Sequence, residues 1–280
     1  MLPLSDALQS AEIVLRDAGV ATARLDAELL LAHIIGCPRM ALRWKCSAGI
    51  GGVEAKKFWH AVRRRAGREP LQYIVGEVQF YGLSIAVDRR VFIARNETEE
   101  FVNALISRLG SAPIRSILDL GTGSGALALA LAKNFSQAEV LAVDASGDAI
   151  DVASQNAKRN SIENVTFVRS NWFERIVGKF DLVVSNPPYL TAEEFENSQE
   201  EIKFFEPREA LVAEMNGLSD IFEIIRNCGQ FLCNGGTLAI ETGDSQHAAI
   251  ANFAKTYFEK FESAADLSGR DRFVFLRKCT

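Results

Sequence analysis

The first 68 residues show a hydrophobic pattern that is typical of helices. Apolar side chains recur every three or four positions in three stretches, a spacing that places them on one face of a helix. Ser5 can cap the first stretch, and glycines (Gly19, Gly36 and Gly67) follow the stretches, where helices commonly end. The pattern therefore predicts a small helical bundle, with helices over about residues 4–18, 25–35 and 55–66.

The period changes between residues 71 and 93. Val78 and Phe80, and then Ile85 and Val87, alternate with more polar neighbours on either side of Gly82. Alternation around a glycine is typical of a β-hairpin. We predict a helical substrate-docking domain over residues 1–70, a hairpin linker over 71–96 and a second domain over 97–280.

From residue 115 onward, short β-rich runs alternate with helical stretches. This alternation is typical of βαβ units and predicts an α/β fold with a mostly parallel sheet that is covered on both faces. Ligands bind such sheets outside the carboxyl ends of the strands, so residues that follow strands are the functional candidates. The predicted strands span residues 117–120, 140–144, 165–168, 181–185, 237–241 and 273–276.

Composition and charge narrow the class of protein. With 48% hydrophobic and 24% charged residues, the 280-residue chain is neither disordered nor fibrous, and its length suggests about two domains. Residues 1–96 carry 14 Lys and Arg against 9 Asp and Glu, whereas residues 97–280 carry 17 against 27. The acidity of the larger part argues against a protein that mainly grips a nucleic-acid backbone.

The cysteines and the N-terminus suggest a cytoplasmic protein. No two cysteines form a Cys-x-x-Cys pair, which predicts neither a disulfide framework nor a metal site. No basic segment precedes an apolar stretch at the N-terminus, and no apolar run is long enough for a membrane span, so no membrane partner is expected. The cysteines are Cys37, Cys46, Cys228, Cys233 and Cys279.

A glycine-rich turn follows the first predicted strand of the sheet. Glycines permit a tight turn and let a ligand approach the backbone, and the start of the next helix offers free N–H groups. Asp119 either orders the ligand or caps the turn, and Asp144, at the end of the second strand, can accept both hydrogen bonds of a ribose diol. The spacing also fits a dinucleotide fingerprint, so a nicotinamide dehydrogenase stays open here. The predicted nucleotide-binding turn is Gly121, Thr122, Gly123, Ser124 and Gly125.

The fourth predicted strand ends in Asn186-Pro187-Pro188-Tyr189, which we call the tetrad. The amide oxygen of Asn186 and the carbonyl of Pro187 are two acceptors beside the flat ring of Tyr189, an arrangement that suits a planar –NH2 group. Holding both hydrogens of this poor nucleophile orients it and stabilises the positive charge that develops during attack. The tetrad favours methyl transfer from S-adenosylmethionine to an –NH2 group over hydride transfer.

Short motifs along nearly the whole chain resemble those of the release-factor glutamine methyltransferases, the HemK-like family. Ala94 and Asn96 are a departure, because the family usually has prolines there. The matching motifs are Arg68 to Gly76, Arg95 with Glu97-Thr98-Glu99, Leu118 to Gly125, Asn186 to Tyr189, Glu206-Pro207-Arg208 with Ala210-Leu211, Glu241-Thr242-Gly243 and Gly269-Arg270-Asp271-Arg272.

The resemblance implies a Rossmann-like, seven-stranded class I methyltransferase domain behind the helical domain. It implies methylation of the glutamine side-chain nitrogen in the Gly-Gly-Gln motif of class I peptide-chain release factors, with S-adenosylmethionine as the cofactor. In that family the glycine-rich turn and the Asp corresponding to Asp144 bind the cofactor, and a Trp matching Trp172 flanks the adenine; core filling is the alternative for Trp172. The tetrad residues Asn186, Pro187, Pro188 and Tyr189 grip the glutamine, and Asn186 also borders the cofactor.

Two charged segments and two other functions stay open. The basic cluster around the third helix is either a solvated face or a docking surface, and the acidic run after the tetrad is interpreted as a solvent-facing lid. A nucleic-acid adenine amino-methyltransferase would use the same tetrad on a flipped base, although no direct nucleic-acid substrate is expected. The other alternative is a non-catalytic S-adenosylmethionine-binding partner of translation. The charged residues are Lys56, Lys57, Arg63, Arg64, Arg65 and Arg68, and Glu193, Glu194, Glu196, Glu200 and Glu201.

Overall fold

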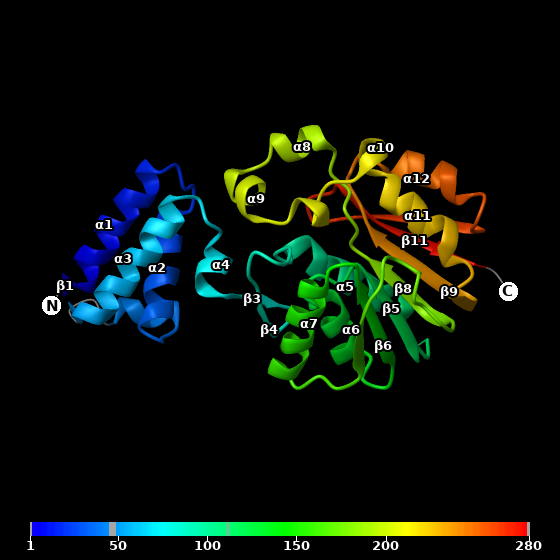
Figure 1. The fold of residues 1–280 in the computed structure, drawn as a ribbon, viewed down its shortest axis with the longest axis horizontal. Helices are drawn as coiled ribbons and strands as arrows, with labels where there is room; N and C mark the ends of the chain where they lie inside the picture. Colours follow the sequence, from blue (N-terminus) through cyan, green and yellow to red (C-terminus); the bar gives the residue numbers. More distant parts are fainter. Residues whose placement is uncertain (1, 45–48, 111, 279–280) are drawn as a thin grey trace. The chain divides into compact units, whose positions relative to one another are not determined.

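A computed structural model describes residues 2–44, 49–110 and 112–278 (Figure 1). The chain divides into two compact units: the first comprises Met1–Gly76 and Gln199–Phe205, and the second comprises Glu77–Ser198 and Glu206–Thr280. No helix within the described ranges is long and apolar enough to cross a membrane. Cys37, Cys228 and Cys233 are free thiols, and Cys46 and Cys279 lie outside the described residues.

The first unit is a bundle of helices around its own apolar core. Three longer helices supply the core, in which Leu15, Leu30 and Phe58 are fully buried. Their bounds agree with the hydrophobic pattern to within about three residues. The elements are β1 (Leu2–Pro3), α1 (Leu4–Asp17), α2 (Ala23–Ile34), η1 (Arg39–Arg43), β2 (Gly49–Ile50), α3 (Gly52–Ala66), α4 (Leu71–Val75) and α9 (Glu200–Phe205), with β1 and β2 paired antiparallel.

Part of the basic cluster is used inside the first unit. Arg65 is 6% exposed; it donates to Asp26 at 2.7 Å and lies 2.9 Å from Glu201. Arg68 donates to the same Glu201 at 2.6 Å. Glu201 therefore differs from the solvent-facing lid that the sequence suggested, because it neutralises arginines of the helical unit. Lys56, Lys57 and Arg63, and the acidic Glu193, Glu194 and Glu196, are exposed.

The second unit contains a seven-stranded sheet in the order β10-β11-β9-β8-β5-β6-β7. The strands β5 to β9 run parallel, and β10 and β11 pair antiparallel at one edge. The α/β fold and the seven strands implied by the resemblance are confirmed. The strands are β5 (Ser116–Leu120), β6 (Glu139–Asp144), β7 (Val165–Arg169), β8 (Phe180–Ser185), β9 (Leu232–Glu241), β10 (Lys260–Ala265) and β11 (Asp271–Arg277).

Helices cover both faces of this sheet (Figure 1). On one face, α11 (Ser219–Cys228) and α12 (His247–Ala254) pack against buried strand residues such as Leu118 and Ile240. On the other side lie α5 (Asn96–Leu109), α6 (Ala126–Asn134) and α7 (Gly147–Arg159). The remaining elements are the antiparallel hairpin β3 (Glu77–Phe80) and β4 (Leu83–Ala86), and the short helices α8 (Ala192–Glu196), η2 (Arg208–Ala210) and α10 (Glu214–Gly217).

The strand order creates a crevice beside β5. The chain leaves β5 for β6 and β7 on one side and returns on the other side as β8 and β9. Segments that follow β5, β6 and β8 therefore diverge at the carboxyl ends of these strands, where α/β sheets bind their ligands. The glycine-rich turn, Asp144 and the tetrad all lie in these segments.

Candidate active site

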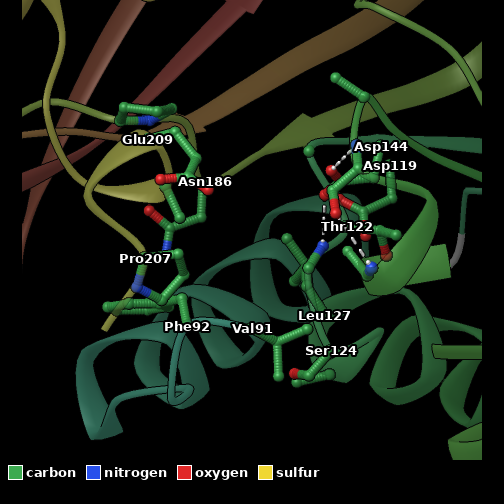
Figure 2. A pocket seen from close by; sticks show the side chains of 18 of the residues that line it. Val91, Phe92, Asp119, Thr122, Ser124, Leu127, Asp144, Asn186, Pro207 and Glu209 are labelled. Atoms are coloured by element: carbon green, nitrogen blue, oxygen red, sulfur yellow. Dashed lines mark hydrogen bonds between the residues drawn. The ribbon is translucent and has the colours of Figure 1, made fainter. Parts of the chain in front are cut away.

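A cavity of about 300 Å³ lies at the carboxyl ends of the strands, within the second unit (Figure 2). This volume is in the range of small-molecule sites. The structure brings most of the sequence-predicted residues together there; Gly125, Pro187 and Tyr189 are not among those that line it. The predicted residues in the wall are Asp119, Gly121, Thr122, Gly123, Ser124, Asp144, Trp172, Asn186 and Pro188.

Asp144 anchors the glycine-rich turn. Its Oδ2 accepts a hydrogen bond from the backbone N–H of Gly123, and its Oδ1 accepts one from Ser146, each at 2.9 Å. Burial raises the pKa of Asp144, and these two hydrogen bonds oppose the rise. Gly125 has φ +82°, and a Cβ there would lie 3.0 Å from the Cβ of Ala153. Asp144 thus orders the turn while its remaining lone pairs face the cavity.

Asp119 is a buried carboxylate without a partner. It is 1% exposed, and neither of its oxygens makes a hydrogen bond within residues 2–44, 49–110 and 112–278. Burial raises its pKa to about 7; the Thr122 hydroxyl and the backbone N–H of Ala128 lie near enough to oppose the rise, and the charge of Asp144 adds to it. Because Asp144, and not Asp119, holds the Gly123 amide, the carboxylate of Asp119 is available to a ligand. An unpaired buried carboxylate in a cavity wall favours a cationic or N–H-bearing guest.

Trp172 forms part of the wall and also touches the core. It follows β7 with φ +43°, a backbone conformation that bulky residues rarely adopt. Its ring lies over Gly121, where a Cβ would be 3.5 Å from the nearest ring atom. Burial raises the pKa of Asp220 in the same wall, opposed by hydrogen bonds from the Trp172 indole and from Ser219. The side chain packs against the hydrophobic core as well, so Trp172 both fills the core and lines the cavity, and its contact with adenine stays a prediction.

Asn186 faces the cavity from the end of β8. Its Nδ2 donates a hydrogen bond to the hydroxyl of Thr98 at 3.2 Å. Figure 2 shows Asn186 on one side of the cavity and Asp119 with Asp144 on the other. The cavity therefore places the tetrad amide opposite the predicted nucleotide-binding carboxylates.

The tetrad backbone is fixed from behind by Gln246. The Nε2 of Gln246 donates to the carbonyl of Tyr189 at 2.9 Å and to that of Gly217 at 3.2 Å. The guanidinium of Arg272 lies 5.9 Å from the centre of the Tyr189 ring, and burial raises the pKa of the Tyr189 hydroxyl. Burial therefore keeps the tyrosine neutral although the charge of Arg272 opposes it, and the hydrogen bonds of Gln246 hold the backbone in place.

An ion pair holds the segment in which Ala94 and Asn96 stand in place of the family's usual prolines. Arg95 pairs with Glu206, which is 6% exposed and also accepts from the backbone N–H of Ile93 at 3.3 Å. The guanidinium of Arg95 lies over the Phe92 ring, 4.7 Å from its centre. Ala94 lines the cavity from within this segment, which is thus held by side chains.

Three residues from separate elements stand in the family motifs, but sequence reasoning assigned them no role in the site. Thr98 begins α5, Glu241 ends β9 and Arg272 lies in β11, and all three neighbour the tetrad. Glu241 did have a signal, because it is a carboxylate at the end of a predicted strand, as Asp144 is. Thr98 stands in the motif Glu97-Thr98-Glu99, but its contact with Asn186 was not predictable, since only the tertiary fold brings α5 to the tetrad.

Comparisons with known proteins decide the family. Residues 6–76 match the PrmC N-terminal domain, and residues 83–214 match the Methyltransferase small domain. The release factor glutamine methyltransferase of Buchnera aphidicola subsp. Schizaphis graminum is 39% identical over 91% of this chain and 92% of its own length. That of Deinococcus radiodurans is 35% identical over 99% of both chains. The chain belongs to the release factor glutamine methyltransferase family.

Solved structures agree with this family in fold. The T. Thermophilus 16S rRNA N2 G1207 methyltransferase, solved in complex with AdoMet and guanosine, superposes with a TM-score of 0.53 and 18% identity, over 72% of this chain and 49% of that one. The comparisons therefore confirm both predictions: the methyltransferase fold, and the resemblance of the motifs to the release factor glutamine methyltransferase family. The nicotinamide dehydrogenase that the glycine spacing left open is excluded.

Proposed function

We propose that this chain transfers a methyl group from S-adenosylmethionine to the side-chain amide nitrogen of the glutamine in the Gly-Gly-Gln motif of class I release factors. One observation carries the proposal: one cavity holds both Asp119, a buried carboxylate without a hydrogen bond in the described part of the chain, and Asn186, whose N–H is bound by Thr98. The names of the relatives support the release factor as the substrate.

The donor set of the cavity fits S-adenosylmethionine. Asp119 would receive a cationic part of the cofactor, Asp144 would accept from its ribose, and Trp172 would flank its adenine. When bound, the cofactor supplies an electrophilic methyl group on a sulfonium. A structural neighbour of the same fold was solved with AdoMet, which supports this cofactor.

Asn186 performs the decisive step on the acceptor side. Its free amide oxygen accepts one N–H of the substrate amide, and the Pro187 carbonyl accepts the other. The nitrogen lone pair is then directed at the methyl group, and both oxygens stabilise the positive charge that develops on nitrogen. The alkylated nitrogen is acidic enough to release its proton to solvent, so no strong base is required. We propose Asn186, Pro187 and Tyr189 as the catalytic tetrad residues, with Pro188 completing the substrate site.

Transfer of labelled methyl to an intact release factor tests the proposal. Label should appear on the release factor and should be absent when the glutamine of its Gly-Gly-Gln motif is replaced. Double-stranded DNA and single-stranded DNA are offered as further substrates, because they test the adenine amino-methyltransferase alternative. Label on DNA, or label that persists after the glutamine is replaced, contradicts the proposal. Binding of the cofactor without transfer to any substrate would favour the non-catalytic alternative.

A further inference from the structure

A buried carboxylate behind the tetrad is not used by the function proposed above. Glu241 is 1% exposed, and its Oε2 makes no hydrogen bond within the described part of the chain. Burial raises the pKa of Glu241 to about 7, opposed by hydrogen bonds from Thr98 and Asn186 and by the charge of Arg272. A buried ionisable group with an unsatisfied oxygen lowers stability, and such groups concentrate at functional sites.

The contacts of Glu241 bear on which way the side-chain amide of Asn186 is turned. An asparagine amide presents two donors on its nitrogen and one acceptor oxygen, and rotation by 180° exchanges them. The Nδ2 of Asn186 donates to the Thr98 hydroxyl at 3.2 Å, and Thr98, which is 3% exposed, interacts in turn with Glu241. Because the Thr98 hydroxyl accepts a hydrogen bond from Asn186, its own proton is free to be donated, and the carboxylate of Glu241 is the nearby acceptor.

The opposite orientation of the amide is disfavoured by charge. If Asn186 were rotated, its oxygen would face the hydroxyl oxygen of Thr98 and the carboxylate of Glu241, which are both almost fully buried. Two acceptors would then meet without a proton between them, and the Asn186 donors would point into the cavity. An –NH2 group cannot be held by donors, so a rotated amide would not bind it productively.

We propose that Glu241 is a positioning residue: acting with Thr98, it fixes the Asn186 amide with its nitrogen inward and its oxygen toward the substrate. The inference rests on the proposed function, since the direction of the oxygen matters only if an –NH2 group is received. Glu241 touches no substrate. The charged or titratable groups that face it are Arg272 from β11, Glu97 from α5 and Tyr189 of the tetrad.

Paired variants of Thr98 test the relay. Thr98→Val keeps the shape but removes the hydroxyl, whereas Thr98→Ser keeps the hydroxyl. With an intact release factor, Thr98→Val should lower kcat by about a hundredfold, the cost typical of losing one oriented polar group, and leave the cofactor Kd near wild type. Thr98→Ser should restore most of kcat. The control is Thr237→Val, a buried threonine earlier in β9 that does not line this cavity.

Glu241→Gln separates positioning from structural support. The substitution removes a buried charge, so the melting temperature should equal or exceed that of wild type at pH 8 although kcat falls at least tenfold. The wild-type kcat should rise with pH as Glu241 ionises near pH 7. In Glu241→Gln this rising part of the pH profile of kcat should be flat. A purely structural role predicts the reverse, a melting temperature that falls together with kcat and a pH limb that persists.

The outcomes distinguish this inference from the function on which it rests. If wild-type protein transfers no methyl group to the release factor, the proposed function fails and the inference fails with it. If wild type is active and both Thr98→Val and Glu241→Gln stay within twofold of its kcat, only the inference is overturned. Equal losses in Thr98→Val and Thr98→Ser would also overturn it, because the hydroxyl would then have no role.

Discussion

At the scale of single residues, the site depends on three polar side chains, Asp119, Asp144 and Asn186, which differ in which of their atoms are hydrogen-bonded. Asp144 has both oxygens engaged by backbone N–H groups, whereas Asp119 has neither engaged within the described ranges. Asn186 has its nitrogen engaged and its oxygen available. Asp144 therefore shapes the turn, and we propose that Asp119 binds the cofactor and that the oxygen of Asn186 binds the substrate nitrogen.

Asn186→Ala should abolish most turnover and spare cofactor binding. Removing the amide leaves one acceptor for the substrate –NH2 group, so we expect kcat to fall by about a hundredfold to a thousandfold. Calorimetry should give a cofactor Kd close to that of wild type, because the turn and both carboxylates are untouched. The control is Asn197→Ala, which changes an exposed asparagine. Near-normal turnover of Asn186→Ala would contradict the proposed clamp on the nitrogen.

The ionisation of Asp119 should make cofactor affinity depend on pH. Its pKa of about 7 means that the carboxylate becomes protonated as the pH falls through 7 and can no longer attract a cation. Affinity should therefore be highest above pH 8 and fall by up to about tenfold per pH unit below 7. Asp119→Asn should bind weakly at pH 8 and lose this dependence. Asp148→Asn, at an exposed position, should keep the wild-type profile in calorimetric titrations from pH 5.5 to 8.5.

The same residues show how far sequence reasoning reaches. Asp144 and Asn186 were predicted because Asp144 ends, and Asn186 directly follows, a strand that the hydrophobic pattern reveals. Glu241 stands in an equivalent position, but its role depends on Thr98, which is distant in sequence and lies in a helix that the pattern did not single out. Local patterns give the end of each strand; the partners that orient a side chain there come from the tertiary fold.

At the scale of elements, an unusual turn holds the tetrad. Met215, Asn216 and Gly217 follow one another with φ values of +54°, +57° and +76°, although a left-handed backbone is unfavourable for residues with a Cβ. A Cβ on Gly217 would lie 2.0 Å from the carbonyl oxygen of Tyr189. This carbonyl also accepts from Gln246, so the turn and the tetrad are packed against each other.

Gly217→Ala should disturb the tetrad, and Gly235→Ala is its matched control. Gly235 has a similar φ of +72° with nothing within 4 Å of an added Cβ. Its substitution should lower the free energy of unfolding by about 1 kcal/mol, the cost of a left-handed alanine. Gly217→Ala should cost about 3 kcal/mol and also lower kcat, because the clash displaces Tyr189. Chemical denaturation and methyl transfer measure both effects; equal effects in the two variants would contradict the packing argument.

The sheet was predictable except at its edge. Five of the predicted strands carry runs of apolar residues because they are buried, and β7, at the other edge, carries Val165, Phe167 and Val168, which are partly buried. Each was predicted within a few residues, apart from the early start of β9 at Leu232. The seventh strand, β10, has exposed Lys260 and Glu262 in its sequence and is an edge strand, so it lacks the apolar run. Its place in the sheet comes from pairing with β11, which no local pattern reports.

At the scale of the whole molecule, the chain builds two units that differ in charge. The first compact unit includes α9, although this helix follows the tetrad in the sequence. Glu201 in α9 pairs with Arg65 and Arg68. With α9 included, the unit contains 12 Lys and Arg against 9 Asp and Glu. Part of the basic cluster thus stabilises the unit, and the exposed remainder is the candidate docking surface.

Charge reversal at this remainder tests whether the helical unit docks the release factor, which we propose. Lys56, Lys57 and Arg63 are exposed on α3, so replacing all three by Glu should leave the fold intact. Arg65→Glu, by contrast, would bury a carboxylate beside those of Asp26 and Glu201. The triple variant should lower kcat/KM for an intact release factor about tenfold at low salt, through slower encounter.

The matched control reverses three exposed lysines of the second unit, Lys158, Lys179 and Lys255, and gives the chain the same net charge. Only the α3 variant should be impaired, and the difference should vanish near 1 M salt, where the screening length is about 3 Å. Cofactor Kd should be unchanged in both variants, because the cavity lies in the second unit. Equal impairment in both would show that overall charge, and not this surface, governs encounter; no impairment in either would remove α3 as the docking surface.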